Sequence, residues 1–103
     1  MSPRRIQWGS KQRFAKAKLA DLSDHVVLVS RPRKWGNPFP VEEKTKTGHA
    51  AAVEKFRRHL IDNPHLIAEA RYELAGWDLA CACAPGWPCH ADVLLRVAAG
   101  GAP

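Results

Sequence analysis

All three cysteines of this 103-residue chain lie near its carboxyl end, and a histidine directly follows the last of them. The stretch reads "CACAPGWPCH" and holds Cys81, Cys83, Cys89 and His90. A thiol beside an imidazole can act as a nucleophile that a general base activates, and thiols also bind soft metal ions. The pattern therefore predicts a reactive site, with a plain buried position for Cys81 as the alternative.

The spacing of these residues predicts where their side chains point. Cys81 and Cys83 are two positions apart in a short predicted strand, so their side chains share one face. Cys89 and His90 begin a predicted helix, where free amides and the helix dipole lower a thiol pKa and attract anions. Asp92, in the first turn of this helix, can interact favourably with the positive end of the helix dipole or can orient the histidine. The candidate catalytic residues are Cys83, Cys89, His90 and Asp92.

Zinc binding by the same residues is the rival interpretation. Cys83, Cys89 and His90 offer ligands, and Cys81 could be a fourth. The spacing argues against zinc, because Cys-x-Cys in a strand differs from the Cys-x-x-Cys knuckle that surrounds a tetrahedral ion. The neighbours Cys89 and His90 are also expected to diverge on a helix. We therefore assign no metal ligand and no cofactor from the sequence, and a zinc-stapled interaction module stays an alternative.

A second segment with chemical potential is "RPRKWGNPFPVE", which begins at residue 31. Its three prolines exclude regular structure. Cations beside an indole favour a nucleotide, because charge meets phosphate and the ring stacks on a base. The alternative is that Trp35 and Phe39 pack into the core while the basic residues face water. The candidate ligand-binding residues are Arg31, Arg33, Lys34, Trp35, Gly36 and Asn37.

The elements that must position these two loops are those of an α/β fold. The predicted elements are a strand at 25–30, helices at 49–63 and 64–76, a strand at 77–83 and a helix at 89–100. Strands joined by a helical crossover run parallel, so both loops leave the same edge of the sheet. Ligands of open α/β sheets bind at that edge. We therefore predict one small Rossmann-like α/β domain, with helices packed on a mainly parallel sheet.

Length and charge bound the class of protein. The chain suffices for one domain, which we place at residues 25–100, after a basic amino-terminal segment at 1–24. A helix over residues 10–20, capped by Ser10, is expected in that segment. No apolar run reaches the roughly 20 residues that span a bilayer, and a secretory signal core is missing. Three cysteines do not suit a disulfide framework, so a cytoplasmic protein without a membrane partner is expected.

The motifs "VVLVSRPRKWGNPF" and "LACACAPGWPCHADVLL" resemble the signature of the family known as domain of unknown function 4326, from bacteria and their phages. The resemblance spans most of residues 26–97 and implies an α/β fold without a settled activity. This chain departs from the family pattern at Ala82, where many members have an aromatic residue, and at Trp87, which enlarges the last loop. The residues that the resemblance carries over are Arg31, Pro32, Lys34, Trp35, Gly36, Asn37, Pro38, Cys81, Cys83, Pro88, Cys89, His90 and Asp92.

These residues favour the binding of a phosphorylated small molecule or nucleotide in a cleft between the two loops. In this hypothesis Arg31, Arg33 and Lys34 neutralise phosphate, and Trp35 stacks on a base. Whether a reaction is catalysed stays open, since neither a phosphate-cradling P-loop nor a pair of catalytic carboxylates is recognisable. The net charge of +6 supports a second hypothesis, a nucleic-acid-binding or regulatory protein that uses its basic amino-terminal segment.

Overall fold

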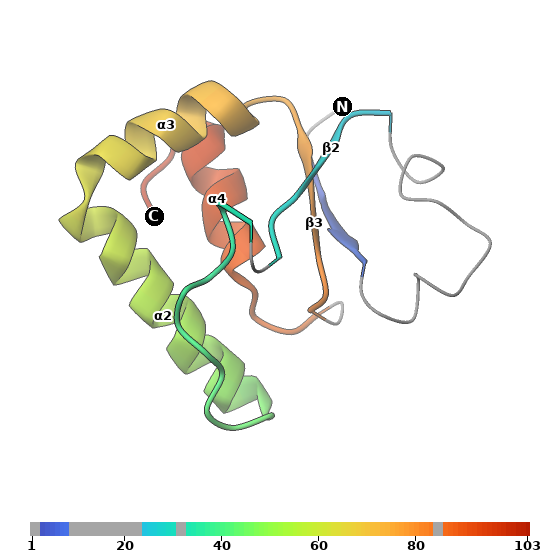
Figure 1. The fold of residues 1–103 in the computed structure, drawn as a ribbon, viewed down its shortest axis with the longest axis vertical. Helices are drawn as coiled ribbons and strands as arrows, with labels where there is room; N and C mark the ends of the chain where they lie inside the picture. Colours follow the sequence, from blue (N-terminus) through green and yellow to red (C-terminus); the bar gives the residue numbers. More distant parts are fainter. Residues whose placement is uncertain (1–2, 9–23, 31–32, 84–85) are drawn as a thin grey trace.

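The sheet of this protein is parallel. The computed structural model describes residues 3–8, 24–30, 33–83 and 86–103. Among these residues the strands are β1 (Arg5–Gln7), β2 (Val26–Leu28) and β3 (Asp78–Cys81). Their order is β1-β3-β2, so the strand that comes last in the chain lies in the centre (Figure 1). The predicted α/β class is confirmed, and Rossmann-like fits in the broad sense of parallel strands with a helical crossover.

The central strand β3 is buried at every residue. It pairs with a neighbour on each edge, and α4 contacts it, so a continuous apolar sequence suits it. Two further backbone hydrogen bonds hold its end: Trp8 N donates to Cys81 O at 2.8 Å, and Val29 N donates to Ala80 O at 2.9 Å. The backbone of Cys81 is therefore fixed by the strand beside it.

The helices are α2 (Lys46–Asp62), α3 (Pro64–Leu74) and α4 (His90–Ala98). Helix α2 begins three residues before the predicted start, because the hydroxyl of Thr45 accepts a hydrogen bond from Gly48 N at 3.0 Å. Asn63 precedes α3 as predicted, although its amide donates to His59 O at 2.8 Å instead of capping α3. Gly76, with a φ of 82°, follows the end of α3, where the left-handed backbone favours glycine.

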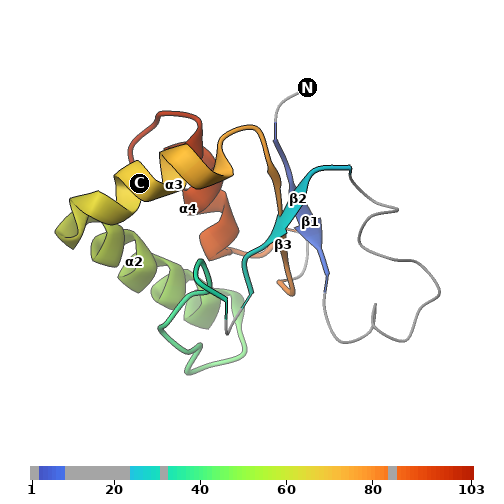
Figure 2. The same ribbon diagram turned by 45° about the horizontal axis from the view of Figure 1, so that its top comes forward.

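All the helices described lie on one side of the sheet (Figures 1 and 2). Helix α4 contacts β3 and β1, and α2 and α3 pack against α4. The buried face of α4 carries Val93, Leu94 and Val97, which meet Leu79 and Phe56 in the core. No helix in the described ranges is both long enough and apolar enough to cross a membrane.

The strand β1 was not predicted from the sequence, because three residues are too few to show a strand pattern. Ile6 is only 7% exposed and stands beside Ala80 in the register. The guanidinium of Arg5 donates to Trp87 O at 2.8 Å and to Asp92 Oδ2 at 3.1 Å, which ties β1 to the start of α4. The helix expected at residues 10–20 lies outside the described residues.

Candidate functional site

The two predicted loops meet around a hollow at the carboxyl ends of β2 and β3. Figure 1 shows the chain leaving both strands at the same end of the sheet. The hollow has a volume of about 400 Å³. Its lining consists of Ser30, Asn37, Phe39 and Val41 after β2, His49, Ala52 and Val53 on α2, and Cys81, Ala82, Cys83, Pro88, Cys89 and His90 from the end of β3 to the start of α4. The predicted convergence of the two loops is confirmed.

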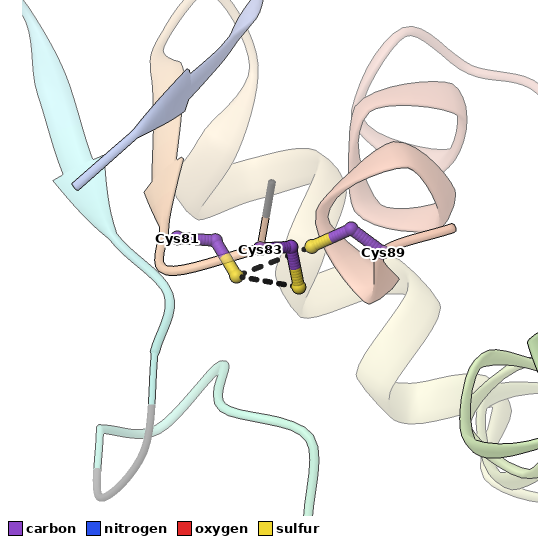
Figure 3. Close-up of side chains that lie close together, drawn as sticks. All are labelled: Cys81, Cys83 and Cys89. Carbon is purple, nitrogen blue, oxygen red and sulfur yellow. Dashed lines mark hydrogen bonds between the residues drawn. The ribbon is translucent and has the colours of Figure 1, made fainter. Parts of the chain in front are cut away.

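The three cysteines meet in the wall of this hollow (Figure 3). Cys81 ends β3, Cys83 follows two residues later, and Cys89 directly precedes α4. Their Sγ atoms all lie within 4.8 Å of one another. The Sγ of Cys81 is 3.4 Å from that of Cys83 and 3.1 Å from that of Cys89. All three are free thiols, with Cys83 the least buried.

Hydrogen bonds among the thiols make their acidities unequal. Contacts with Cys83 and Cys89 hold the pKa of the Cys81 thiol well below its ordinary range. The hydrogen bond to Cys81 raises the pKa of Cys83 to about 11. Hydrogen bonds to Cys81 and Cys83 also raise the pKa of Cys89, and burial adds to that effect. The three thiols therefore differ in acidity, with Cys81 the most acidic of them.

His90 is buried beside the thiols and held in one orientation. Its Nε2 lies 2.7 Å from Val29 O. A carbonyl oxygen only accepts, so Nε2 donates to it, and in the neutral imidazole the lone pair is then on Nδ1. That Nδ1 lies 3.8 Å from Cys89 Sγ. The ring also packs edge-on against Phe56, with centroids 5.2 Å apart.

The expectation that Cys89 and His90 diverge on a helix is wrong. Cys89 has extended backbone angles, with φ −147° and ψ 141°, and is the N-cap residue of α4. His90 is the first helical residue. Because only one of the two neighbours is helical, the thiol and the imidazole approach each other, and the expected divergence no longer argues against zinc.

Asp92 contacts β1 in this structure. Its Oδ2 accepts a hydrogen bond from the Arg5 guanidinium, and this pair joins residues 87 positions apart in the chain. The orientation of His90 comes from the carbonyl of Val29. The suggested role of Asp92 in orienting the histidine stays a prediction. Arg5 was missed from the sequence, since no local pattern indicates so distant a contact.

Among the predicted ligand-binding residues that the structure describes, Asn37 lines the hollow. Its amide nitrogen donates to Ala52 O at 3.1 Å, and its Oδ1 accepts from Phe39 N at 2.9 Å. These bonds attach the loop after β2 to α2 and fix the position of Phe39. The predicted contact of Asn37 with a ligand is untested, and its amide already serves the loop.

Other residues of the first loop lie away from the hollow lining. Trp35 is 6% exposed, and its Nε1 donates to Glu73 Oε1 at 3.2 Å. Lys34 forms ion pairs with Glu73 and Glu69 on α3. Trp35 is therefore packed into the core, as the alternative interpretation expects. Its stacking on a ligand stays a prediction. Arg33 is exposed, and Arg31 lies outside the described residues.

Several lining residues were missed in the sequence. Phe39 and Val41 come from the proline-rich loop, where no periodicity shows direction. His49 is different, because it extends the helical face of Ala52, Val53 and Phe56 by one turn. Its ring stands edge-on to that of Trp87, with centroids 5.0 Å apart. The period of α2 is the signal that could have placed His49 in the hollow.

The fold and the site together define the class of protein: a small α/β protein with a thiol-lined pocket at the carboxyl ends of its parallel strands. Residues 12–100 match the family described as domain of unknown function (DUF4326), and the chain belongs to that family. The match includes both loops and confirms the resemblance in their motifs. No curated protein and no solved structure is significantly similar to the chain.

Proposed function

We propose that the protein binds a nucleoside or nucleotide in the hollow between the two loops, with the base inside and any phosphate at the rim. The supporting observation is that both strand-end loops wall a single hollow. Its volume of about 400 Å³ falls in the range of small-molecule sites. Its position is the one at which open α/β sheets bind ligands.

The composition of the lining suits a flat heteroaromatic ring. Phe39, Val41 and Val53 offer apolar surface that can cover the faces of such a ring. Ser30 and the imidazole of His49 supply polar groups that can meet its edge. A few polar groups in an apolar cavity are the usual basis of ligand orientation.

A phosphate is expected outside this lining. No Arg or Lys lines the hollow among the residues that the structure describes, and a phosphate buried without partners is costly. Helix α4 begins beside the hollow, and the positive end of its dipole favours an anion. The sequence adds Arg31 and Arg33, which follow β2 closely, as cations for the same group.

Calorimetry with a panel of nucleosides and nucleotides tests this proposal. Phe39→Ala removes an aromatic wall of the hollow and is expected to weaken binding about tenfold, since an aromatic contact contributes up to about 1.5 kcal/mol. Tyr72→Ala is the matched control, because Tyr72 is 89% exposed on α3 and does not line the hollow. The control is expected to bind like the wild type.

Two results would contradict nucleotide binding in the hollow. The first is a folded protein that binds no member of the panel, or binds one equally well with either substitution. The second is steeply salt-dependent binding of an oligonucleotide that Phe39→Ala leaves unchanged, which would assign the function to a basic surface.

A further inference from the structure

Three sulfur atoms converge from separate parts of the backbone, and an imidazole nitrogen lies beside one of them. The thiols belong to the end of β3, to the turn after it and to the N-cap of α4 (Figure 3). The pairwise limit of 4.8 Å leaves one point close to all three sulfurs. The Nδ1 of His90 lies beside one of these thiols, 3.8 Å from Cys89 Sγ.

We propose that the three cysteine thiolates bind a zinc ion and that Nδ1 of His90 is its fourth ligand. Three thiolates with one imidazole form a donor set of structural zinc sites. Soft sulfur ligands also favour zinc over magnesium or calcium, which prefer oxygen. The ion would replace the thiol protons and join the end of β3 to the start of α4.

The distances fit a tetrahedral ion after a small adjustment. Zinc–sulfur bonds of about 2.3 Å place tetrahedral sulfurs about 3.8 Å apart. The separations of 3.1 and 3.4 Å therefore need to widen by roughly half an ångström. A zinc–nitrogen bond of about 2.0 Å places nitrogen and sulfur about 3.5 Å apart, close to the 3.8 Å between His90 Nδ1 and Cys89 Sγ. His90 is outside the group of ligand atoms that all lie within 4.8 Å of one another, so its ring has to move toward the other two sulfurs to complete the site.

The hydrogen bond from His90 Nε2 to Val29 O is an independent indication of a metal ligand. Histidines that bind zinc usually donate their second ring nitrogen to a carbonyl or carboxylate, which fixes the tautomer and aims the free nitrogen. A histidine that only filled core space would not need its lone pair directed at the thiols. Because four protein ligands close the coordination sphere, this site does not depend on the proposed nucleotide binding.

Titration of the reduced, metal-free full chain with Co²⁺ and then Zn²⁺ tests the site. Thiol counting first confirms that all cysteines are reduced. We expect about one metal ion per chain, with the strong visible absorption of tetrahedral Co²⁺ and sulfur-to-cobalt charge-transfer bands in the near ultraviolet. Zinc is expected to displace the cobalt and abolish both signals, since zinc prefers a tetrahedral sulfur-rich site.

Cys83→Ser removes one ligand at the least buried thiol, and Ala82→Ser puts the same hydroxyl at an exposed neighbouring position. The first change is expected to weaken zinc binding at least about 100-fold and to remove about a third of the charge-transfer intensity. The second is expected to bind zinc like the wild type. His90→Ala is expected to keep the charge-transfer bands and change the visible spectrum, whereas His65→Ala, at an exposed position, leaves both unchanged.

Equal zinc affinities of Cys83→Ser and Ala82→Ser would overturn the proposal. So would a reduced, folded wild type whose cobalt complex lacks charge transfer, or that binds no cobalt. If Cys83→Ser does not fold, the charge-transfer intensity of the wild type counts the thiolates directly, and fewer than three contradict the site. An unchanged visible spectrum in His90→Ala would overturn the assignment of the fourth ligand.

Discussion

At the scale of single residues, the polar side chains of the hollow are held by the backbone. Asn37 bonds to Ala52 O and Phe39 N, and His90 bonds to Val29 O. In the described part of the chain, no buried side-chain nitrogen or oxygen lacks a hydrogen-bond partner. These side chains are therefore already held in place, so the proposed ligand would need little reordering of them.

Replacing Asn37 measures how much its hydrogen bonds contribute. Asn37→Ala breaks both hydrogen bonds and leaves partly buried backbone groups without their partners. We expect the free energy of unfolding to fall by about 1–3 kcal/mol, measured by urea denaturation. Thr47→Ala, at an exposed position of α2, should change it by less than about 0.5 kcal/mol. Equal stabilities of the two variants would show that the amide does not hold the loop.

At the scale of elements, the short strand β1 is attached to the fold at several points. It pairs with β3 and contacts α4. It also carries Arg5, whose guanidinium donates hydrogen bonds to Trp87 O in the loop before α4 and to Asp92 in the first turn of α4. An isolated segment of three residues would not be stable, so these contacts supply its order. The same contacts restrain the loop that brings Cys89 to the other thiols.

The contribution of β1 can be measured at its buried residue. Ile6→Ala removes most of a side chain that is only 7% exposed, and we expect a loss of about 2–4 kcal/mol in a single unfolding transition. Gln7→Ala, at the exposed neighbour, should stay within about 0.5 kcal/mol of the wild type. Denaturant curves monitored by circular dichroism provide the comparison. Indistinguishable curves for the two variants would show that β1 is not part of the cooperative core.

At the scale of the whole molecule, basic side chains outnumber acidic ones. The chain has 16 Lys and Arg against 10 Asp and Glu, so protonation adds to an existing positive charge. Among the acidic residues, Glu73 joins two parts of the fold, because its carboxylate accepts hydrogen bonds from Lys34 and from the Trp35 indole. Its hydrogen bond with Lys34 holds the pKa of Glu73 below its ordinary value, and the Trp35 bond adds to this.

A lowered pKa in the folded state stabilises the protein above the unfolded pKa, and this contribution disappears as the pH falls through the folded pKa. We therefore expect Glu73→Gln to lower the melting temperature at neutral pH and to converge with the wild type in acid. The side chains are partly exposed, so the difference should stay below about 1 kcal/mol. Glu69→Gln, which breaks the longer ion pair of 3.6 Å, should have a smaller effect. Thermal melts between neutral pH and about pH 3 distinguish the two variants. If the difference in melting temperature between Glu73→Gln and the wild type is the same across that range, the charge of Glu73 does not have this role.

The sequence determined the local elements and the loops that carry the site. Successive β-branched residues before position 30 predict a buried strand, and the pair at 63–64 predicts a helix start, because such signals act over a few positions. Loops that follow parallel strands leave the same edge of the sheet, so a hollow between them was also predicted. The motifs around Trp35 and Cys89 likewise identified the family.

Tertiary structure alone decided which side chains meet within that framework. Trp35 contacts Glu73 across 38 positions and Arg5 contacts Asp92 across 87, and no local period encodes such pairs. The approach of His90 to the thiols depends on one extended residue, Cys89, directly before α4. Periodicity describes the face of an element, whereas coordination geometry depends on how several elements pack together.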